Sequence, residues 1–169
     1  MKACDFFLAQ LDAEAPRTRH AIENVPEGRE DWRPHAKSMS LGQLANLVAM
    51  MPGWFAMMVD DDSLDLNPPG GGRQEMPRPT SASGRIAMLE QGLVRARKAF
   101  AATTDDHLMK PWRLLVAGQV VSEMPRQEFL RDTFSHLAHH RGQLTVYLRL
   151  NDAPVPAIYG PSADDQSFA

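Results

Sequence analysis

The chain has 169 residues, of which 43% are hydrophobic and 23% charged, and these values are typical of one globular domain. We therefore expect a single domain over residues 1–169. The formal net charge of −3 argues against a basic nucleic-acid-binding surface. No stretch has the apolar length of a signal peptide or membrane span, so we expect a cytoplasmic protein. The single cysteine excludes an intramolecular disulfide framework and a cysteine-based zinc cluster.

The first half of the chain contains two amphipathic segments. Apolar residues recur at spacings of three and four over residues 5–24, which predicts a helix that Pro16 is expected to bend or restart. The same spacing predicts a second helix over residues 41–60, with Ser40 as its N-cap. Pro52 lies inside this second stripe, so we expect a kink or a break there.

The second half begins with a connection and ends with the longest helix. Residues 60–80 are acidic and then rich in Pro and Gly, so we expect a crossover connection without regular structure. A third helix is expected from residue 80 or 83 to residue 103, and a short hairpin over residues 111–125. A fourth helix is expected over residues 126–150. The remaining tail is expected to be extended, with Tyr159 packed on the helices.

These elements predict an all-α fold, a four-helix bundle in which a long crossover joins the second and third helices. The ten methionines are consistent with this fold, since flexible thioethers fill irregular gaps in a core. An apolar ligand cavity lined by methionine is the alternative. Four of the methionines lie in the second predicted helix: Met50, Met51, Met57 and Met58.

Three of the six histidines lie within five residues of the fourth predicted helix. On a helical wheel, His136 and His140 stack one turn apart at the edge of the apolar face, whereas His139 points outward. Two imidazoles at this spacing can bind one divalent ion, and a facing helix can supply a further ligand. The alternative is a pair of core-edge histidines that form hydrogen bonds to Tyr147 or to a facing residue.

Two sequence runs resemble a known family. HLAHHRGQLTVYLRLNDAPVPAIYGPSADD resembles the C-terminal signature of the DinB/YfiT-like metalloenzymes, and DWRPHAKSMSLGQLANLVAMMPGW resembles their second helix with its preceding loop. The resemblance extends over nearly the whole chain. It implies a four-helix bundle, often a homodimer, in which one histidine of helix 2 and an HxxxH pair of helix 4 hold nickel or zinc. Relatives include thiol-dependent transferases and a thiol-dependent isomerase, and some members are induced by DNA damage.

The resemblance assigns His136 and His140 as metal ligands but leaves the third position empty. Leu47 stands where the family has its helix-2 histidine, and leucine cannot coordinate a metal. Gln43, one turn earlier, is the nearest oxygen donor and a weak ligand, whereas Asn46 points away. The expected site is therefore degenerate and binds an ion weakly. The spacing gives no reason to bring in the remaining histidines, His20, His35 and His107.

Other polar and aromatic residues have two interpretations each. Arg141 falls near the core direction, where it would pair with Glu14 or Glu90 or face an acidic group of a ligand. Tyr147 would donate to a backbone carbonyl or to a substrate oxygen. Cys4 is interpreted as a passive thiol. The candidate cavity-lining residues are Leu47, Met51, Trp54, Tyr147 and Arg141.

Three functional hypotheses follow. The first is a DinB-like metal-dependent enzyme, of the hydrolase or thiol-dependent transferase type, with a degenerate nickel or zinc site. Its partner would be a small-molecule substrate or a thiol, and the resemblance implies a homodimer. The second is a non-catalytic module that binds a small molecule without metal. The third is a stress-related, dimerising bundle protein with a filled cavity. None of the three involves nucleic acid or a membrane.

Overall fold

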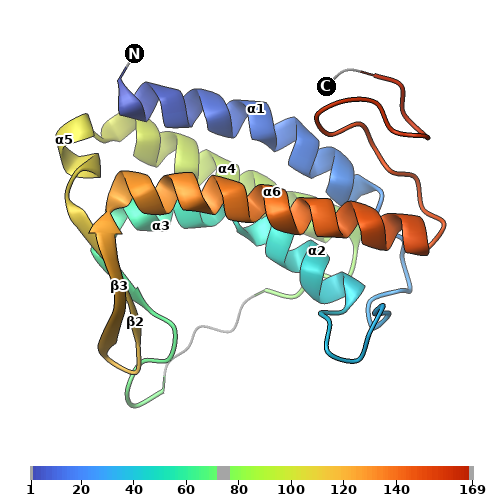
Figure 1. Ribbon diagram of the computed structural model, residues 1–169, viewed down its shortest axis with the longest axis horizontal. Coiled ribbons are helices and arrows are strands. Elements are labelled where there is room, and N and C mark those ends of the chain that lie inside the picture. Colours follow the sequence, from blue (N-terminus) through green and yellow to red (C-terminus); the bar gives the residue numbers. More distant parts are fainter. Residues whose placement is uncertain (1, 72–76, 168–169) are drawn as a thin grey trace.

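In the computed structural model, which describes residues 2–71 and 77–167, long helices lie side by side and a small sheet projects from one end (Figure 1). The helices are α1 (Ala3–Glu23), α2 (Leu41–Met50), α3 (Pro52–Asp60), α4 (Ala82–Ala102), α5 (Asp105–Leu108) and α6 (Arg126–Leu150). The strands are β1 (Ser63–Asp65), β2 (Pro111–Val116) and β3 (Gln119–Pro125). None of the helices in the described residues has the length and apolar character that crossing a membrane requires.

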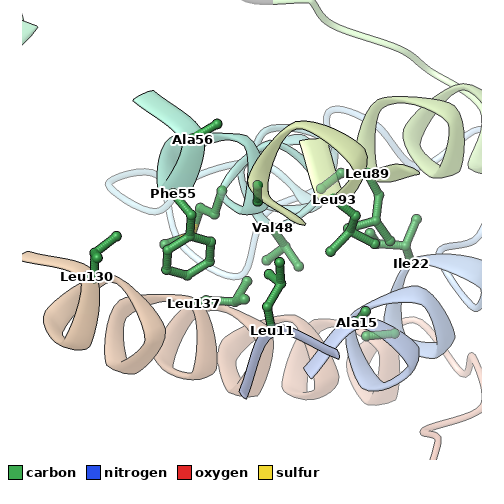
Figure 2. Close-up of a cluster of buried hydrophobic side chains, with 14 of the residues drawn as sticks. Leu11, Ala15, Ile22, Val48, Phe55, Ala56, Leu89, Leu93, Leu130 and Leu137 are labelled. Atoms are coloured by element: carbon green, nitrogen blue, oxygen red, sulfur yellow. The ribbon is translucent and has the colours of Figure 1, made fainter. Parts of the chain in front are cut away.

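The hydrophobic core lies between the long helices, which each contribute one apolar face. Phe55 of α3 stacks on Phe134 of α6 with ring centroids 4.2 Å apart, and Phe7 of α1 lies 6.2 Å from the same ring. Burial of these faces supplies most of the stability of such helices. Figure 2 shows residues of this cluster converging from α1, α2, α3, α4 and α6: Leu11, Ala15, Ile22, Val48, Phe55, Ala56, Leu89, Leu93, Leu130 and Leu137.

The prediction of an all-α four-helix bundle is wrong, because the chain also builds a three-stranded mixed sheet. The hairpin expected over residues 111–125 is present as antiparallel β2 and β3, and its turn residues Ala117 and Gly118 have φ values of 52° and 78°. β1 adds to β2 in parallel, with Leu64 opposite Leu114. The strand order is β1-β2-β3.

β1 lies inside the acidic segment that was expected to lack regular structure. Three residues are too few to show an alternating pattern, and the strand exists because β2 lies beside it. The side chain of Asp65 fixes this pairing, since its carboxylate accepts hydrogen bonds from the backbone N–H groups of Ala117 (3.1 Å) and Gly118 (2.7 Å). The rest of the crossover includes residues 72–76, which lie outside the described residues.

Two proline residues were expected to interrupt predicted helices, and only one of them does. The break expected at Pro52 is confirmed: the second predicted helix is divided into α2 and α3 at Met51, because Pro52 has no N–H for the helical ladder. α1 is continuous through the exposed Pro16 and does not restart there. It begins at Ala3 rather than Asp5, because the Asp105 carboxylate accepts the N–H groups of Ala3 (3.0 Å) and Cys4 (3.1 Å). These two bonds also lower the pKa of Asp105.

α3 and α4 run parallel and approach closely at two glycines. A methyl group placed on Gly92 would lie 2.8 Å from the backbone nitrogen of Gly53. We therefore expect Gly92→Ala to lower the free energy of unfolding by about 1–3 kcal/mol, because the two backbones must separate. Gly142→Ala in α6 is the control: its methyl group meets no atom within 4 Å, so about 0.5–1 kcal/mol of stabilisation is expected. Urea unfolding midpoints measure both changes, and an unchanged midpoint for Gly92→Ala would contradict the tight crossing.

Candidate functional site

Helix α6 runs antiparallel to α2 and α3 and holds the histidines against them. Thr133 donates its hydroxyl to the Met58 sulfur at 3.4 Å, and the rings of His136 and Trp54 lie 6.1 Å apart. Further along, the Tyr147 hydroxyl donates to the Met39 carbonyl at 3.3 Å. Residues progressively later in α6 therefore lie opposite residues progressively earlier in α3 and α2.

His136 and His140 lie on neighbouring turns of α6, as the wheel predicted, and their Nε2 atoms are 2.8 Å apart. His136 is the more exposed of the two residues and His140 the more buried, so the pair lies at the edge of the core. The other ring nitrogen of His140, Nδ1, lies 2.8 Å from the side-chain oxygen of Gln143. His139 is exposed, and its ring contacts that of His140 edge to face at 5.0 Å.

The surroundings of His136 disfavour its charged form. Partial burial lowers its pKa below the usual value, and the neighbouring charges of His140 and then His139 lower it further. A neutral imidazole keeps a nitrogen lone pair, which is the form that binds a metal ion.

Leu47 lies at the same level of the helices as the histidine pair. In the antiparallel pairing, Met39 lies beside Tyr147 and Trp54 lies beside His136. Leu47 falls between Met39 and Trp54 along the chain, so its level along α6 is near His140. Leu47 is half-buried and packs against the core. The position at which the resemblance implies a histidine thus lies near the level of the pair along the helices and holds a side chain without a donor atom.

The other donors considered in the sequence are engaged elsewhere. The side-chain oxygen of Gln43 accepts from the Ser40 N–H at 2.8 Å in a capping box, and that of Asn46 accepts from Arg85 Nε at 2.9 Å. His107 Nε2 bonds to the Val59 carbonyl at 2.8 Å. Within residues 2–71 and 77–167, no three His, Cys, Asp or Glu side chains gather as a metal site would require.

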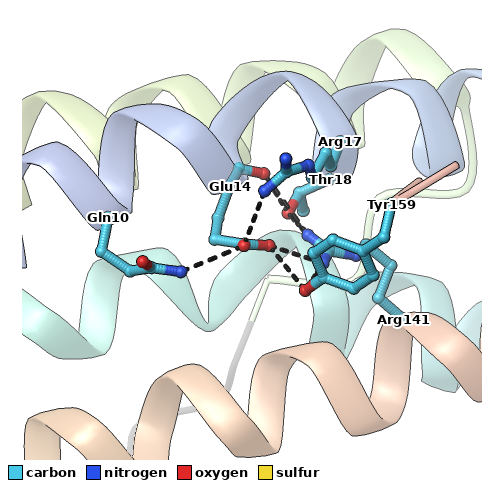
Figure 3. A network of polar contacts seen from close by, with 6 residues as sticks. All are labelled: Gln10, Glu14, Arg17, Thr18, Arg141 and Tyr159. Atoms are coloured by element: carbon cyan, nitrogen blue, oxygen red, sulfur yellow. Dashed lines mark hydrogen bonds and ion pairs between the residues drawn. The ribbon is translucent and has the colours of Figure 1, made fainter. Parts of the chain in front are cut away.

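Arg141 forms the predicted ion pair with Glu14, and both side chains are buried (Figure 3). One nitrogen, Nη2, lies 2.5 Å from the Glu14 carboxylate and 2.6 Å from the Tyr159 hydroxyl, which in turn donates to Glu14 at 3.1 Å. The other, Nη1, donates to the Thr18 hydroxyl at 3.0 Å. This network joins α1, α6 and the C-terminal tail. Glu90, the other partner considered, pairs with Arg19.

The remaining candidate residues serve the fold in the structure. Tyr147 donates to a backbone carbonyl, which confirms the first of its two interpretations, and its ring contacts Trp32 edge to face at 5.4 Å. Met51 is fully buried, and Trp54 is half-buried against the core. Two surface pockets of about 380 and 450 Å³ are lined by other residues. That the five candidates line a ligand cavity stays a prediction.

Gln143 is the residue of this site that sequence reasoning missed. It follows His140 by three positions, so on a helix the two side chains are neighbours. This spacing, together with an amide side chain that can form a hydrogen bond to a ring nitrogen, could have predicted the contact between Gln143 and His140.

The sequence model of the DinB family matches residues 2–167. The chain belongs to the DinB family. A curated relative, described as the uncharacterized protein YrdA of Bacillus subtilis (strain 168), is 26% identical over 162 residues. This match spans 95% of the chain and 90% of YrdA.

Two crystal structures of DinB-like proteins share the fold. YjoA of Bacillus subtilis superposes with a TM-score of 0.66 and 16% identity, over 86% of this chain and 92% of YjoA. A DinB-like protein of Bacillus cereus ATCC 10987 superposes with a TM-score of 0.68 and 22% identity, over 90% and 95% of the two chains.

Proposed function

We propose that this DinB-family protein is a degenerate member of the metal-binding type, in which His136 and His140 bind a divalent ion weakly and reversibly. The observation that carries the proposal is the 2.8 Å separation of the two Nε2 atoms on one exposed helix edge. Zinc, nickel and copper accept imidazole nitrogen. Two such nitrogens on one helix face form half of a typical site.

The residues fit such an ion in donor type but not in number. Zn–N bonds of about 2.0–2.1 Å at a tetrahedral angle require nitrogens about 3.3 Å apart. The two rings would therefore have to rotate until their Nε2 lone pairs converge on the ion instead of pointing at one another. Catalytic zinc sites use three protein ligands, however, and Leu47 supplies none. We therefore derive no hydrolase or thiol-transferase step through a metal. Water, or a thiol from solution, would complete the coordination.

Metal titration of the apoprotein by calorimetry tests the proposal. The wild-type chain is expected to bind one Zn²⁺ or Ni²⁺ weakly, and His140→Ala is expected to lose this binding because a single imidazole remains. His139→Ala is the matched control: His139 is exposed on the same helix and lies outside the pair, so its loss should change the affinity far less than His140→Ala does. Equal affinity in wild type and His140→Ala, or no binding by wild type, would refute the proposal and favour a binding module without metal.

A further inference from the structure

We infer that Gln143 is the positioning residue of the histidine pair, because it selects the tautomer in which His140 presents a lone pair to the site. The inference rests on the proposed function in one respect: that His136 and His140 form the ligand-binding pair. It concerns a side chain that neither the family match nor the relatives assign to any role.

With the Gln143 amide oxygen facing the ring, as in the structure, the hydrogen-bond chemistry allows one arrangement. The side-chain oxygen of Gln143 can only accept, so the proton of this 2.8 Å bond belongs to Nδ1 of His140. A neutral imidazole carries one N–H, so Nε2 of His140 has a free lone pair. Nε2 of His136, 2.8 Å away, must then donate its own proton to that lone pair. The two histidines therefore hold opposite tautomers when no ion is bound.

This arrangement separates the roles of the two histidines. His140 is already in the form that binds an ion, because Gln143 keeps the proton on the nitrogen that faces away from the site. His136 has to move its proton from Nε2 before both nitrogens can bind. A partner behind a ligating histidine that fixes its tautomer is a recurring feature of metal sites, and its loss typically lowers affinity by about 10- to 100-fold.

Nitrogen NMR of the imidazole rings, in metal-free protein at about pH 8 where histidine is mostly neutral, tests the inference. The His140 signals are assigned as those that are absent from the spectrum of His140→Gln. In wild type they are expected to show the proton on Nδ1. Gln143→Leu removes the acceptor, and a mixture of tautomers is expected. Gln143→Glu keeps an acceptor and should restore the Nδ1–H form. Gln127→Leu, on the same helix, is the control and should leave the spectrum unchanged.

Metal affinity provides a second measurement. Gln143→Leu is expected to weaken Zn²⁺ binding by about 10- to 100-fold, whereas Gln143→Glu and Gln127→Leu are not. A His140 proton on Nε2 in wild type, or tautomers unchanged by Gln143→Leu, would overturn the inference even if zinc binds. Conversely, the His140 tautomer could change with Gln143→Leu in a protein that does not bind zinc. That result would refute the proposed function and support the positioning role of Gln143.

Discussion

Replacing Leu47 with histidine is expected to tighten Zn²⁺ or Ni²⁺ binding by about a hundredfold. The antiparallel pairing of α2 with α6 places residue 47 level with His140, so the new imidazole would provide the third nitrogen. Structural zinc contributes roughly 10–16 kcal/mol in total, so one ligand of three or four accounts for about 3 kcal/mol, and each 1.4 kcal/mol changes Kd tenfold. Calorimetric titration of the apoprotein with each metal measures the change.

Two further variants make this experiment decisive. Leu47→Asn keeps the branched shape of leucine and introduces polarity without a good ligand, so its Kd should stay at the wild-type value. The double variant Leu47→His, His140→Ala exchanges one ligand for another and should return close to the two-nitrogen affinity. If Leu47→His and Leu47→Asn bind zinc equally, residue 47 does not face the ion, and the degenerate site must be sought elsewhere.

The histidine pair was predictable because it depends on local geometry alone. A spacing of four residues on a strongly periodic helix determines that His136 and His140 stack and that His139 points away, whatever the rest of the fold does. The ion pair of Arg141 with Glu14 was predictable for a related reason. A buried guanidinium requires an acidic partner, and few acidic residues lie on the core-facing sides of the helices.

Features that depend on distant segments were not predictable in this way. β1 is a strand because β2 and the Ala117–Gly118 turn lie beside Asp65, and α1 begins at Ala3 because Asp105, about a hundred residues later, caps it. The position of Leu47 required the register between α2 and α6, which the sequence suggests only through the family resemblance. Each of these depends on tertiary contact rather than on local propensity.

The buried ion pair is expected to produce the largest loss of stability. Glu14→Leu leaves the Arg141 guanidinium buried without its carboxylate, and Arg141→Met leaves Glu14 without its principal cation. Glu14→Leu should lower the free energy of unfolding by about 3–5 kcal/mol, because the Arg141 charge then stays uncompensated in the interior. Arg141→Met should cost less, because Glu14 keeps its ion pair with Arg17 at 3.0 Å. Urea unfolding of both variants, monitored by circular dichroism, measures the loss.

The double variant Glu14→Leu, Arg141→Met separates the cost of an orphaned charge from the value of the pair. Since apolar replacement of a whole buried pair is often neutral, the double variant should lose much less stability than the sum of the two singles. Its deficit should come from the groups that each lose a hydrogen-bond partner, namely Tyr159, Thr18, Arg17 and Gln10. The control is Asp12→Leu, which breaks the exposed pair with Arg97 and should cost less than about 1 kcal/mol. If the loss in the double variant equalled the sum of the two single losses, Glu14 and Arg141 would stabilise the helices independently, and the ion pair would have no energetic role.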